Sequence, residues 1–311
     1  MQIHFDSIYK GKVRDCYQFG EQYLLIVVSD RISAFDHILP RNIPQKGAVL
    51  NLIAAHFLAA TRDIVPNWLL ATPEAHTAVG YQCEPIRVEM VVRGYLAGHA
   101  LREYERGERM LCGVTLPEGM RPYERFAQPI ITPSTKAIEG HDEDISREAL
   151  LERGFVSEAD YTQMEQYALA LFERGTTMAA ERGLILVDTK YEFGKRGGEV
   201  VLIDEIHTPD SSRYFEANTY PTHFEQGETP PQLSKEFVRE WLMANGFQGK
   251  EGETMPSMPD EFVTEISNRY IALYERITGK NFAAQVQQHA TNNEVSPTEA
   301  YMRALLEKGK V

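Results

Sequence analysis

The strongest pattern of hydrophobic and polar positions lies in residues 184–215, where two apolar, β-branched runs flank a glycine-rich connection. The first run is LILVDTKYEF, the connection is GKRGG, and the second run begins EVVLIDEIH. Val and Ile favour strands and glycine supplies the positive φ of a tight return, so the pattern predicts a β-hairpin. Alternation at period two places Asp188, Lys190 and Glu192 on one face. A register symmetric about GKRGG places Asp204 on that face, roughly opposite Asp188.

The acidic residues on this face need a compensating cation. Like charges that face each other across a hairpin destabilise it by roughly 0.2–1 kcal/mol in water, and by more if the face is buried. Either Lys190 lies between the carboxylates or a divalent cation binds there. Oxygen ligands without nearby His or Cys suit Mg²⁺, which takes one or two protein carboxylates and completes its shell with water and nucleotide phosphates. A solvated strand face is the alternative.

Strand and helix patterns alternate along the rest of the chain and predict an α/β fold. Apolar, β-branched runs predict buried strands at 23–30 and 85–98, and the spacing of apolar residues predicts a helix over 47–61. Ser157 is a typical N-cap for a long helix that Gly183 ends. Further amphipathic helices follow in the C-terminal part of the chain, which carries no recognisable chemistry.

Length and composition narrow the class of protein. The chain has 311 residues and is 43% hydrophobic, which suits one large α/β domain or two lobes. Its net charge of −13 argues against nucleic-acid or anionic-membrane partners, but leaves room for a small anion in a basic pocket. Three distant cysteines without a CxxC pair predict neither disulfides nor a zinc site. We expect no signal peptide or membrane span and a cytoplasmic location.

A basic turn near the N-terminus is the first candidate phosphate site. Lys10, Gly11, Lys12 and Arg14 lie between two predicted strands. Glycine lets a phosphate approach backbone N–H groups closely, and the lysines supply positive charge. A solvated basic turn is an equally good interpretation of these residues alone.

A second candidate phosphate site lies on the predicted strand 85–98. Glu89 and Arg93 stand there among apolar residues, and charges on a buried strand need partners. Gly98 and His99 then begin a helix whose N-terminal N–H groups suit an anion. A structural ion pair in the core is the alternative.

Two polar segments complete the candidate chemistry. The long loop 129–146 is rich in hydroxyl, basic and acidic side chains, and such loops are often functional, although solvated surface is the alternative. The tail TPDSSRYF follows the hairpin. Their candidate residues are Ser134, Thr135, Lys136 and Asp142 in the loop, and Asp210 and Arg213 in the tail.

Six motifs along the chain together resemble the SAICAR synthetase family (phosphoribosylaminoimidazole-succinocarboxamide synthases). They are YKGKVRD, SDRISAFD, VVRGYLAG, ITPSTKAIEGHD, LVDTKYEFG and DEIHTPDSSR. The extension that begins LSKEFVREWL resembles the longer form of the family. The resemblance implies an ATP-grasp-like, two-lobe α/β fold. It divides into a nucleotide-covering N-terminal lobe (1–84), a central catalytic lobe (85–232) and a helical C-terminal extension packed on the central lobe (233–311).

The implied activity is an ATP-dependent carbon–nitrogen ligase of de novo purine biosynthesis. It joins L-aspartate to carboxyaminoimidazole ribotide (CAIR) and gives SAICAR, ADP and phosphate through an acyl phosphate. ATP is the co-substrate and Mg²⁺ the cofactor, and the sequence leaves the oligomeric state open. A small-molecule kinase of related architecture and a non-enzymatic nucleotide-binding protein are the alternatives.

The resemblance also implies roles for single residues. Lys10, Gly11, Lys12 and Arg14 would cover the ATP phosphates, while Pro85 to Glu89 would lie along the adenosine. Glu192 and Asp204 would hold Mg²⁺, with Asp188 in support and Lys190 near the reacting carboxylate. The ribotide phosphate would lie on Arg93, Gly98, His99 and Arg213. The imidazole and aspartate sites would be lined by Ser134, Thr135, Lys136, Asp142 and Asp210.

Two features depart from the pattern of the family. Several relatives carry Ser where this chain has His99, so a hydroxyl contact to phosphate would have to be replaced here, by a backbone N–H or by a protonated imidazole. The implied pairing of Glu192 with Asp204 also differs from the symmetric hairpin register, which sets Asp204 opposite Asp188.

Overall fold

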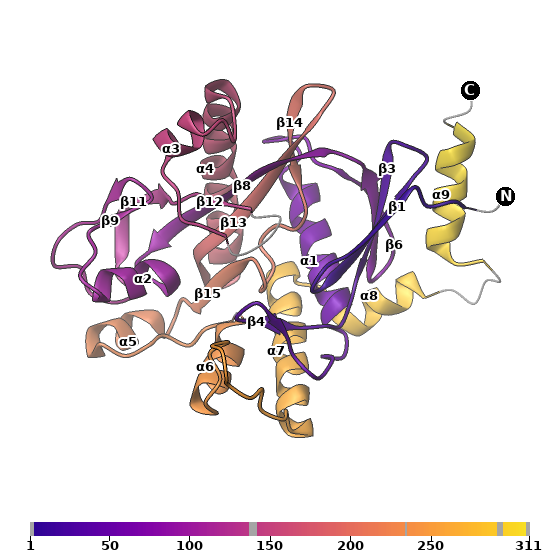
Figure 1. Ribbon diagram of the computed structural model, residues 1–311. Coiled ribbons are helices and arrows are strands. Elements are labelled where there is room, and N and C mark those ends of the chain that lie inside the picture. Colours follow the sequence, from indigo (N-terminus) through magenta and orange to yellow (C-terminus); the bar gives the residue numbers. More distant parts are fainter. Residues whose placement is uncertain (1–2, 137–141, 234, 291–294, 309–311) are drawn as a thin grey trace. The chain divides into compact units, whose positions relative to one another are not determined.

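The structure, a computed structural model, describes residues 3–136, 142–233, 235–290 and 295–308. The residues group into two compact units, whose helices and strands are labelled in Figure 1. Unit 1 comprises Met1–Leu58, Trp68–Gln82 and Ser234–Val311, and unit 2 comprises Ala59–Asn67 and Cys83–Leu233. The three-part division predicted from the sequence stays a prediction.

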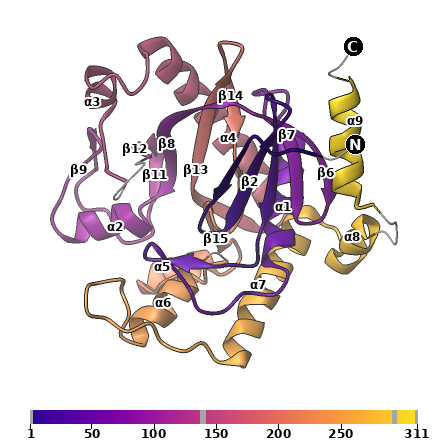
Figure 2. The same ribbon diagram turned by 45° about the vertical axis from the view of Figure 1, so that its right-hand side comes forward.

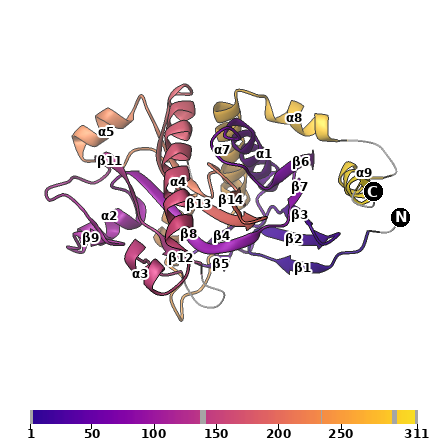
Figure 3. The same ribbon diagram turned by 90° about the horizontal axis from the view of Figure 1, so that it is seen from above.

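Unit 1 is built on a five-stranded antiparallel sheet with the order β1-β2-β3-β7-β6 (Figures 2 and 3). The strands are β1 (Ser7–Lys10), β2 (Arg14–Phe19), β3 (Tyr23–Val28), β6 (Leu69–Glu74) and β7 (Thr77–Tyr81). The apolar run YLLIVV forms the central strand β3, as its β-branched composition predicts. The two-residue strands β4 (Ser33–Ala34) and β5 (His37–Ile38) form a separate small hairpin.

Helices complete unit 1 around this sheet. They are α1 (Lys46–Ala60), whose last two residues fall in unit 2, α6 (Glu236–Ala244), α7 (Asp260–Thr278), α8 (Phe282–His289) and α9 (Pro297–Lys308). The predicted helix 47–61 is therefore present as α1. Asp30 accepts hydrogen bonds from two backbone N–H groups at the start of α1, and Figure 2 shows α9 beside β6.

Unit 2 is built on a six-stranded sheet in which every pairing is antiparallel. Its strand order is β11-β8-β13-β14. In addition, β12 pairs with β8 and β15 pairs with β13. The strands are β8 (Glu84–Tyr95), β11 (Arg125–Ile131), β12 (Ser134–Thr135), β13 (Leu184–Arg196), β14 (Glu199–Ile203) and β15 (Ser212–Glu216). The pair β9 (Met110–Leu111) and β10 (Val114–Thr115) stands apart.

Helix α4 (Glu158–Ala180) packs against β8 and β13 in unit 2 (Figures 1 and 3). The Ser157 hydroxyl accepts a hydrogen bond from the Asp160 N–H at 3.1 Å, which confirms the predicted N-cap. The remaining helices are α2 (Gly98–Glu105), α3 (Arg147–Glu152) and α5 (Tyr220–Gln226). Among the described residues, no helix combines the length and hydropathy needed to cross a membrane.

The predicted hairpin is present as β13 and β14, but its predicted register is wrong. Strand β13 continues through GKR, and only Gly197 and Gly198 form the turn, with φ of 60° and 85°. Two adjacent residues with positive φ fit the tight turn that follows strand twist. The register therefore pairs Glu192 with Ile203, so Asp204 comes beside Glu192 and not opposite Asp188.

Candidate active site

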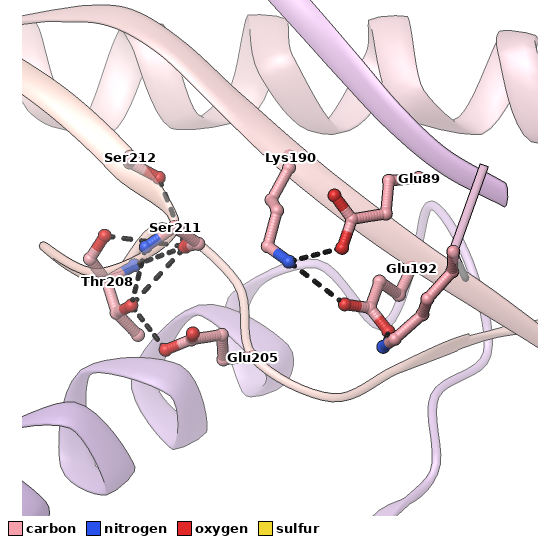
Figure 4. A network of polar contacts seen from close by, with 8 residues as sticks. Glu89, Lys190, Glu192, Glu205, Thr208, Ser211 and Ser212 are labelled. Atoms are coloured by element: carbon pink, nitrogen blue, oxygen red, sulfur yellow. Dashed lines mark hydrogen bonds and ion pairs between the residues drawn. The ribbon is translucent and has the colours of Figure 1, made fainter. Parts of the chain in front are cut away.

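Strand β13 carries the candidate residues on one face, as its period-two alternation predicts. The Lys190 ammonium donates to Glu192 Oε1 at 3.1 Å, two residues along the same strand. It also donates to Glu89 Oε1 on β8 at 2.5 Å (Figure 4). The register places Glu89 directly opposite Glu192, so both carboxylates face one lysine.

Lys136 and Asp204 complete this group, which we call the lysine–glutamate cluster (Glu89, Lys136, Lys190, Glu192 and Asp204). Strand β12 pairs with β8 and brings the Lys136 ammonium to Glu192, with which it forms an ion pair. Asp204 follows β14 with φ of 58°, and its charge helps to raise the pKa values of Lys136 and Lys190. The cluster thus combines three carboxylates with two ammonium groups.

Burial and charge act in opposite directions in the lysine–glutamate cluster. Burial raises the pKa of Glu89, an effect that the Lys190 charge only partly offsets. Burial also disfavours the charged form of Glu192, but Lys190 and Lys136 outweigh it and lower the pKa of Glu192 to about 2. Burial likewise opposes the charge on Lys190, yet Glu192 and Glu89 raise its pKa. Lys190 is therefore a fixed cation at neutral pH and not a general base.

Asp188 lies between two arginines on the neighbouring strands, Arg93 and Arg213, which we call the arginine pair. The register sets Asp188 opposite Arg93 of β8 and opposite Arg213 of β15. Arg213 Nη1 donates to Asp188 Oδ2, and Arg93 Nη1 lies 3.7 Å from the same oxygen. All three side chains are nearly buried. Two guanidinium groups around one carboxylate leave a net positive charge, which suits an anion.

Side-chain hydrogen bonds fix the orientation of both arginines. Arg93 Nε donates to Thr132 Oγ1 at 2.8 Å, and Arg213 Nε donates to Gln232 Oε1 at 3.1 Å. Burial lowers the pKa of Arg93, and the charge of Asp188 acts against that change. These hydrogen bonds fix the planes of the two guanidinium groups, a geometry that suits recognition of an anion.

Gly98 begins α2 directly beside the Arg213 guanidinium. It has φ of 56°, and a Cβ added there would lie 2.5 Å from Arg213 Nη1.

We expect Gly98→Ala to displace the Arg213 guanidinium and to destabilise the fold by about 1 kcal/mol through backbone strain. Thermal unfolding and titration with inorganic phosphate would measure the two effects. Unchanged phosphate affinity in a folded Gly98→Ala protein would contradict this prediction, and Gly107→Ala, at a glycine with φ of 96° and open space, isolates the strain.

His99 follows Gly98 and contacts two carboxylates. Its Nε2 lies 2.5 Å from Asp144 Oδ2, and its Nδ1 lies 3.7 Å from Glu103 Oε1. The hydrogen bond from His99 holds the pKa of Asp144 below its usual range. The ring therefore links α2 to the segment that follows β12, a contact that sequence reasoning did not find.

The other loop and tail residues fall in three places. Ser134 and Thr135 form β12, where Thr135 Oγ1 accepts from the Glu143 N–H at 3.1 Å. Asp142 is exposed, and its charge contributes to raising the pKa of Glu89. The Asp210 N–H donates to Thr208 Oγ1 at 3.3 Å. Residues 137–141 of the predicted loop lie outside the described residues.

A buried network of hydroxyl groups shapes the TPDSSR tail and was not predicted (Figure 4). Thr208 Oγ1 donates to the Glu205 carboxylate, and the Thr208 N–H donates to Ser211 Oγ at 3.1 Å. Ser212 Oγ lies 2.7 Å from Thr189 Oγ1 on β13. The tail is thereby fixed to the strand that carries Lys190. The run of hydroxyl residues in TPDSS was the available signal.

His207 anchors the same tail from within the core. It is fully buried with φ of 57°, and its Nε2 lies 3.3 Å from the Tyr191 hydroxyl. A Cβ on Gly175 of α4 would clash with the ring, so that glycine permits the close packing. The Tyr214 hydroxyl donates to the His207 carbonyl at 2.8 Å.

This burial predicts a pH dependence of stability. Burial lowers the pKa of His207 from 6.5 to about 3. The folded protein excludes a proton that the unfolded chain binds, so the free energy of unfolding falls as pH drops from 6.5 towards 3. The limiting slope is about 1.4 kcal/mol per pH unit. Urea unfolding at several pH values should show a shallower slope for His207→Asn, which tolerates positive φ; equal slopes would contradict the prediction.

The basic turn (Lys10, Gly11, Lys12 and Arg14) belongs to unit 1. Lys10 ends β1, Arg14 begins β2, and the Gly11 N–H donates to the Arg14 carbonyl at 2.7 Å. Lys10 and Lys12 are exposed. The predicted strand, turn and strand are therefore confirmed, while the role of the turn stays a prediction.

The start of β8, predicted to lie along adenosine, borders a cavity of about 880 Å³ in unit 2. Pro85 and Arg87 contribute to its wall from β8, and Phe155 contributes from the connection between α3 and α4. These positions are accessible to a small molecule.

The lysine–glutamate cluster is the candidate metal site. Within the described residues, no group of three or more His, Cys, Asp or Glu side chains has the geometry of a metal centre. Mg²⁺ needs only one or two protein carboxylates when phosphates complete its shell. Glu192 and Asp204 are the two carboxylates that the sequence implied for this role, and the excess of carboxylates over ammonium groups in the cluster is compatible with a further cation.

Comparison with known proteins gives one consistent result. The family model described as SAICAR synthetase matches residues 7–256. A phosphoribosylaminoimidazole-succinocarboxamide synthase of Cytophaga hutchinsonii is 62% identical, with 89% of each chain covered. The enzyme of that name from Bacteroides fragilis is 57% identical, covering 97% of this chain and 95% of the relative. The SAICAR synthase of Saccharomyces cerevisiae, solved with SAICAR, has a TM-score of 0.77 at 32% identity, covering 90% and 98%. The predicted α/β, ATP-grasp-like fold class is confirmed.

Proposed function

Because this chain belongs to the SAICAR synthetase family, we propose that it is the ATP-dependent ligase that joins L-aspartate to CAIR in purine biosynthesis. The products are SAICAR, ADP and phosphate. The yeast relative solved with SAICAR supports this choice of ribotide, since its chain is covered almost completely. The comparisons do not favour a small-molecule kinase or a non-enzymatic nucleotide-binding protein.

The observation that carries the proposal is the spacing of charges along one face of β13. Asp188 lies between the two arginines of the arginine pair. Lys190 and Glu192, two and four residues further along the strand, belong to the lysine–glutamate cluster. A rise of roughly 3.3 Å per residue puts about 7 Å between Asp188 and Lys190 and about 13 Å between Asp188 and Glu192. This spacing suits a ribotide whose phosphate lies on Arg93 and Arg213 and whose carboxylate points towards Lys190.

The proposed reaction has two steps. A carboxylate oxygen of CAIR attacks the γ-phosphorus of ATP, and ADP leaves with the bond electrons. The aspartate amine then attacks the acyl carbon, the C–O bond to the phosphate breaks, and phosphate departs as the amine loses a proton. Lys190 and Lys136 stabilise the negative charge of the carboxylate and of the transferring phosphoryl group, as fixed cations do in phosphoryl transfer.

Glu192 and Asp204 are the proposed Mg²⁺ ligands. When bound, Mg²⁺ neutralises charge on the nucleotide phosphates. Glu192 also holds both lysines, so its carboxylate orients the cations that face the substrate. Asp188 is proposed to orient the two arginines, a role more distant from the metal than the sequence implied.

The remaining assignments follow the family resemblance. We propose that Lys10, Gly11, Lys12 and Arg14 cover the ATP phosphates and that Pro85 to Glu89 lie along the adenosine. Ser134, Thr135, Asp142 and Asp210 are proposed to line the imidazole and aspartate sites. Because the His99 ring contacts Asp144, we propose that the α2 N-terminus binds the ribotide phosphate through its backbone N–H groups and not through that ring. The division at residues 84 and 232 and a cytoplasmic location remain part of the proposal.

Omission of single substrates tests the proposed function. ADP release beyond one equivalent per enzyme should require ATP, Mg²⁺, the ribotide and aspartate together, because without aspartate the acyl phosphate stays in the site and blocks the next turnover. A succinylated product should form in equal amount with ADP. Equal ADP release without aspartate, with no succinylated product, would contradict the ligase activity and favour a phosphotransferase.

A further inference from the structure

Arg31 holds the basic turn in place within unit 1. Its Nε donates to the Lys12 carbonyl at 3.0 Å, and its Nη2 donates to the Gly11 carbonyl at 3.1 Å. The same Nη2 donates to Asp15 Oδ1 on β2 at 2.6 Å. One guanidinium group thus holds two backbone carbonyls of the turn and the strand that follows it. A lysine could not reproduce this fork geometry.

The segment after Arg31 returns to the same turn through a strained hairpin. Strands β4 and β5 are joined by Phe35 and Asp36, which have φ of 50° and 64°. A bulky aromatic residue with positive φ is unusual and persists only where surrounding contacts enforce it. Asp36 Oδ1 lies 2.5 Å from Lys12 Nζ, so this conformation directs a carboxylate at the basic turn.

Phe247 of the C-terminal extension supplies contacts that hold this hairpin. Its side chain is 3% exposed and packs edge-on against the rings of Phe35 and His37, with centroids 6.4 and 5.5 Å away. Gly249, with φ of 79°, lies so close that an added Cβ would be 2.8 Å from Phe35 Cβ. The extension therefore fits tightly against the strained residue itself.

We infer that the C-terminal extension has a functional role: Phe247 and Arg31 are positioning residues that hold the basic turn in its nucleotide-binding form. Phe247 stabilises the hairpin, the hairpin directs Asp36 to Lys12, and Arg31 at its base holds the turn carbonyls. Loss of either residue lets the turn sample other conformations, and the population able to bind phosphate falls. This inference rests on the proposed function only in that the basic turn binds ATP phosphates.

Nucleotide titration of the full chain tests the inference. Phe247→Leu removes the ring contacts but keeps an apolar side chain, and Arg31→Lys keeps the charge but loses the fork. We expect ATP with Mg²⁺, titrated without other substrates, to bind about tenfold more weakly to each variant. Arg31→Lys loses one or two hydrogen bonds to the turn, which are worth about that factor, and Phe247→Leu loosens the hairpin that directs Asp36 to Lys12. The KM of the ribotide should stay unchanged, which a general loss of structure would not allow.

Phe262→Leu is the matched control. Phe262 stacks on Trp241 at 4.4 Å within the same extension and makes no ring contact with the β4–β5 hairpin. It should lower thermal stability, since it removes the stacking on Trp241, while leaving ATP affinity unchanged. Wild-type ATP affinity in folded Phe247→Leu and Arg31→Lys would overturn the inference. Failure of the wild-type protein to bind ATP would instead count against the proposed function.

Discussion

Replacement of Glu192 by glutamine is expected to abolish ligase turnover. Glutamine keeps the shape of the side chain but removes the charge that holds Lys136 and Lys190, and it removes a proposed Mg²⁺ ligand. Each charge-assisted contact is worth about 1.5–3 kcal/mol, so the loss of two predicts at least a hundredfold fall in kcat. Steady-state kinetics at saturating substrates and ordinary Mg²⁺ would measure it. Asp204→Asn should also lower kcat, because it removes the other proposed Mg²⁺ ligand.

Glu199→Gln is the control for this substitution. Glu199 begins β14 in the same hairpin but is exposed and lies outside the lysine–glutamate cluster. It should keep wild-type kcat and thermal stability. Wild-type turnover in Glu192→Gln would remove Glu192 from the proposed metal site.

Arg213→Ala is expected to raise the KM of the ribotide about ten- to a hundredfold, because a charge-assisted hydrogen bond to phosphate is lost. The KM of ATP should not change. The variant also leaves the buried Asp188 without its closest partner, and a broken buried pair costs about 3–5 kcal/mol. Thermal unfolding should therefore accompany the kinetics, with Arg213→Lys as the variant that keeps the charge.

The kinetic pattern separates a phosphate contact from a structural role. Arg125→Ala replaces an exposed arginine of the same sheet and should change neither KM. A defect confined to ATP in Arg213→Ala, or a wild-type ribotide KM in the folded protein, would contradict the assignment of the arginine pair.

Much of the fold was predictable because local patterns agree with tertiary structure. The β-branched run of β13, the Ser157 cap and the alternation of Asp188, Lys190 and Glu192 all depend on neighbours in the sequence. The hairpin register was not predictable from symmetry. Gly194 continues the strand, beside an irregularity in its pairing with β8, so a glycine that seemed to belong to the turn does not.

The contacts missed by sequence analysis join residues far apart in the chain. Lys136 reaches Glu192 because β12 and β13 both pair with β8, an arrangement set by the order of strands. The contact of His99 with Asp144 depends on where the segment after β12 returns. No local spacing encodes such contacts. Polar residue type gave the candidates, and only the sheet topology could join them.

The fate of the carboxylate oxygen tests the central claim most directly. CAIR labelled with oxygen-18 in its carboxylate would be converted with unlabelled ATP and aspartate, and the released phosphate analysed by mass spectrometry. The proposed acyl phosphate predicts one labelled oxygen in each phosphate, formed in equal amount with SAICAR, because the C–O bond breaks when the amine attacks. Unlabelled phosphate alongside SAICAR would contradict the acyl phosphate, and labelled phosphate without SAICAR would contradict the ligase assignment.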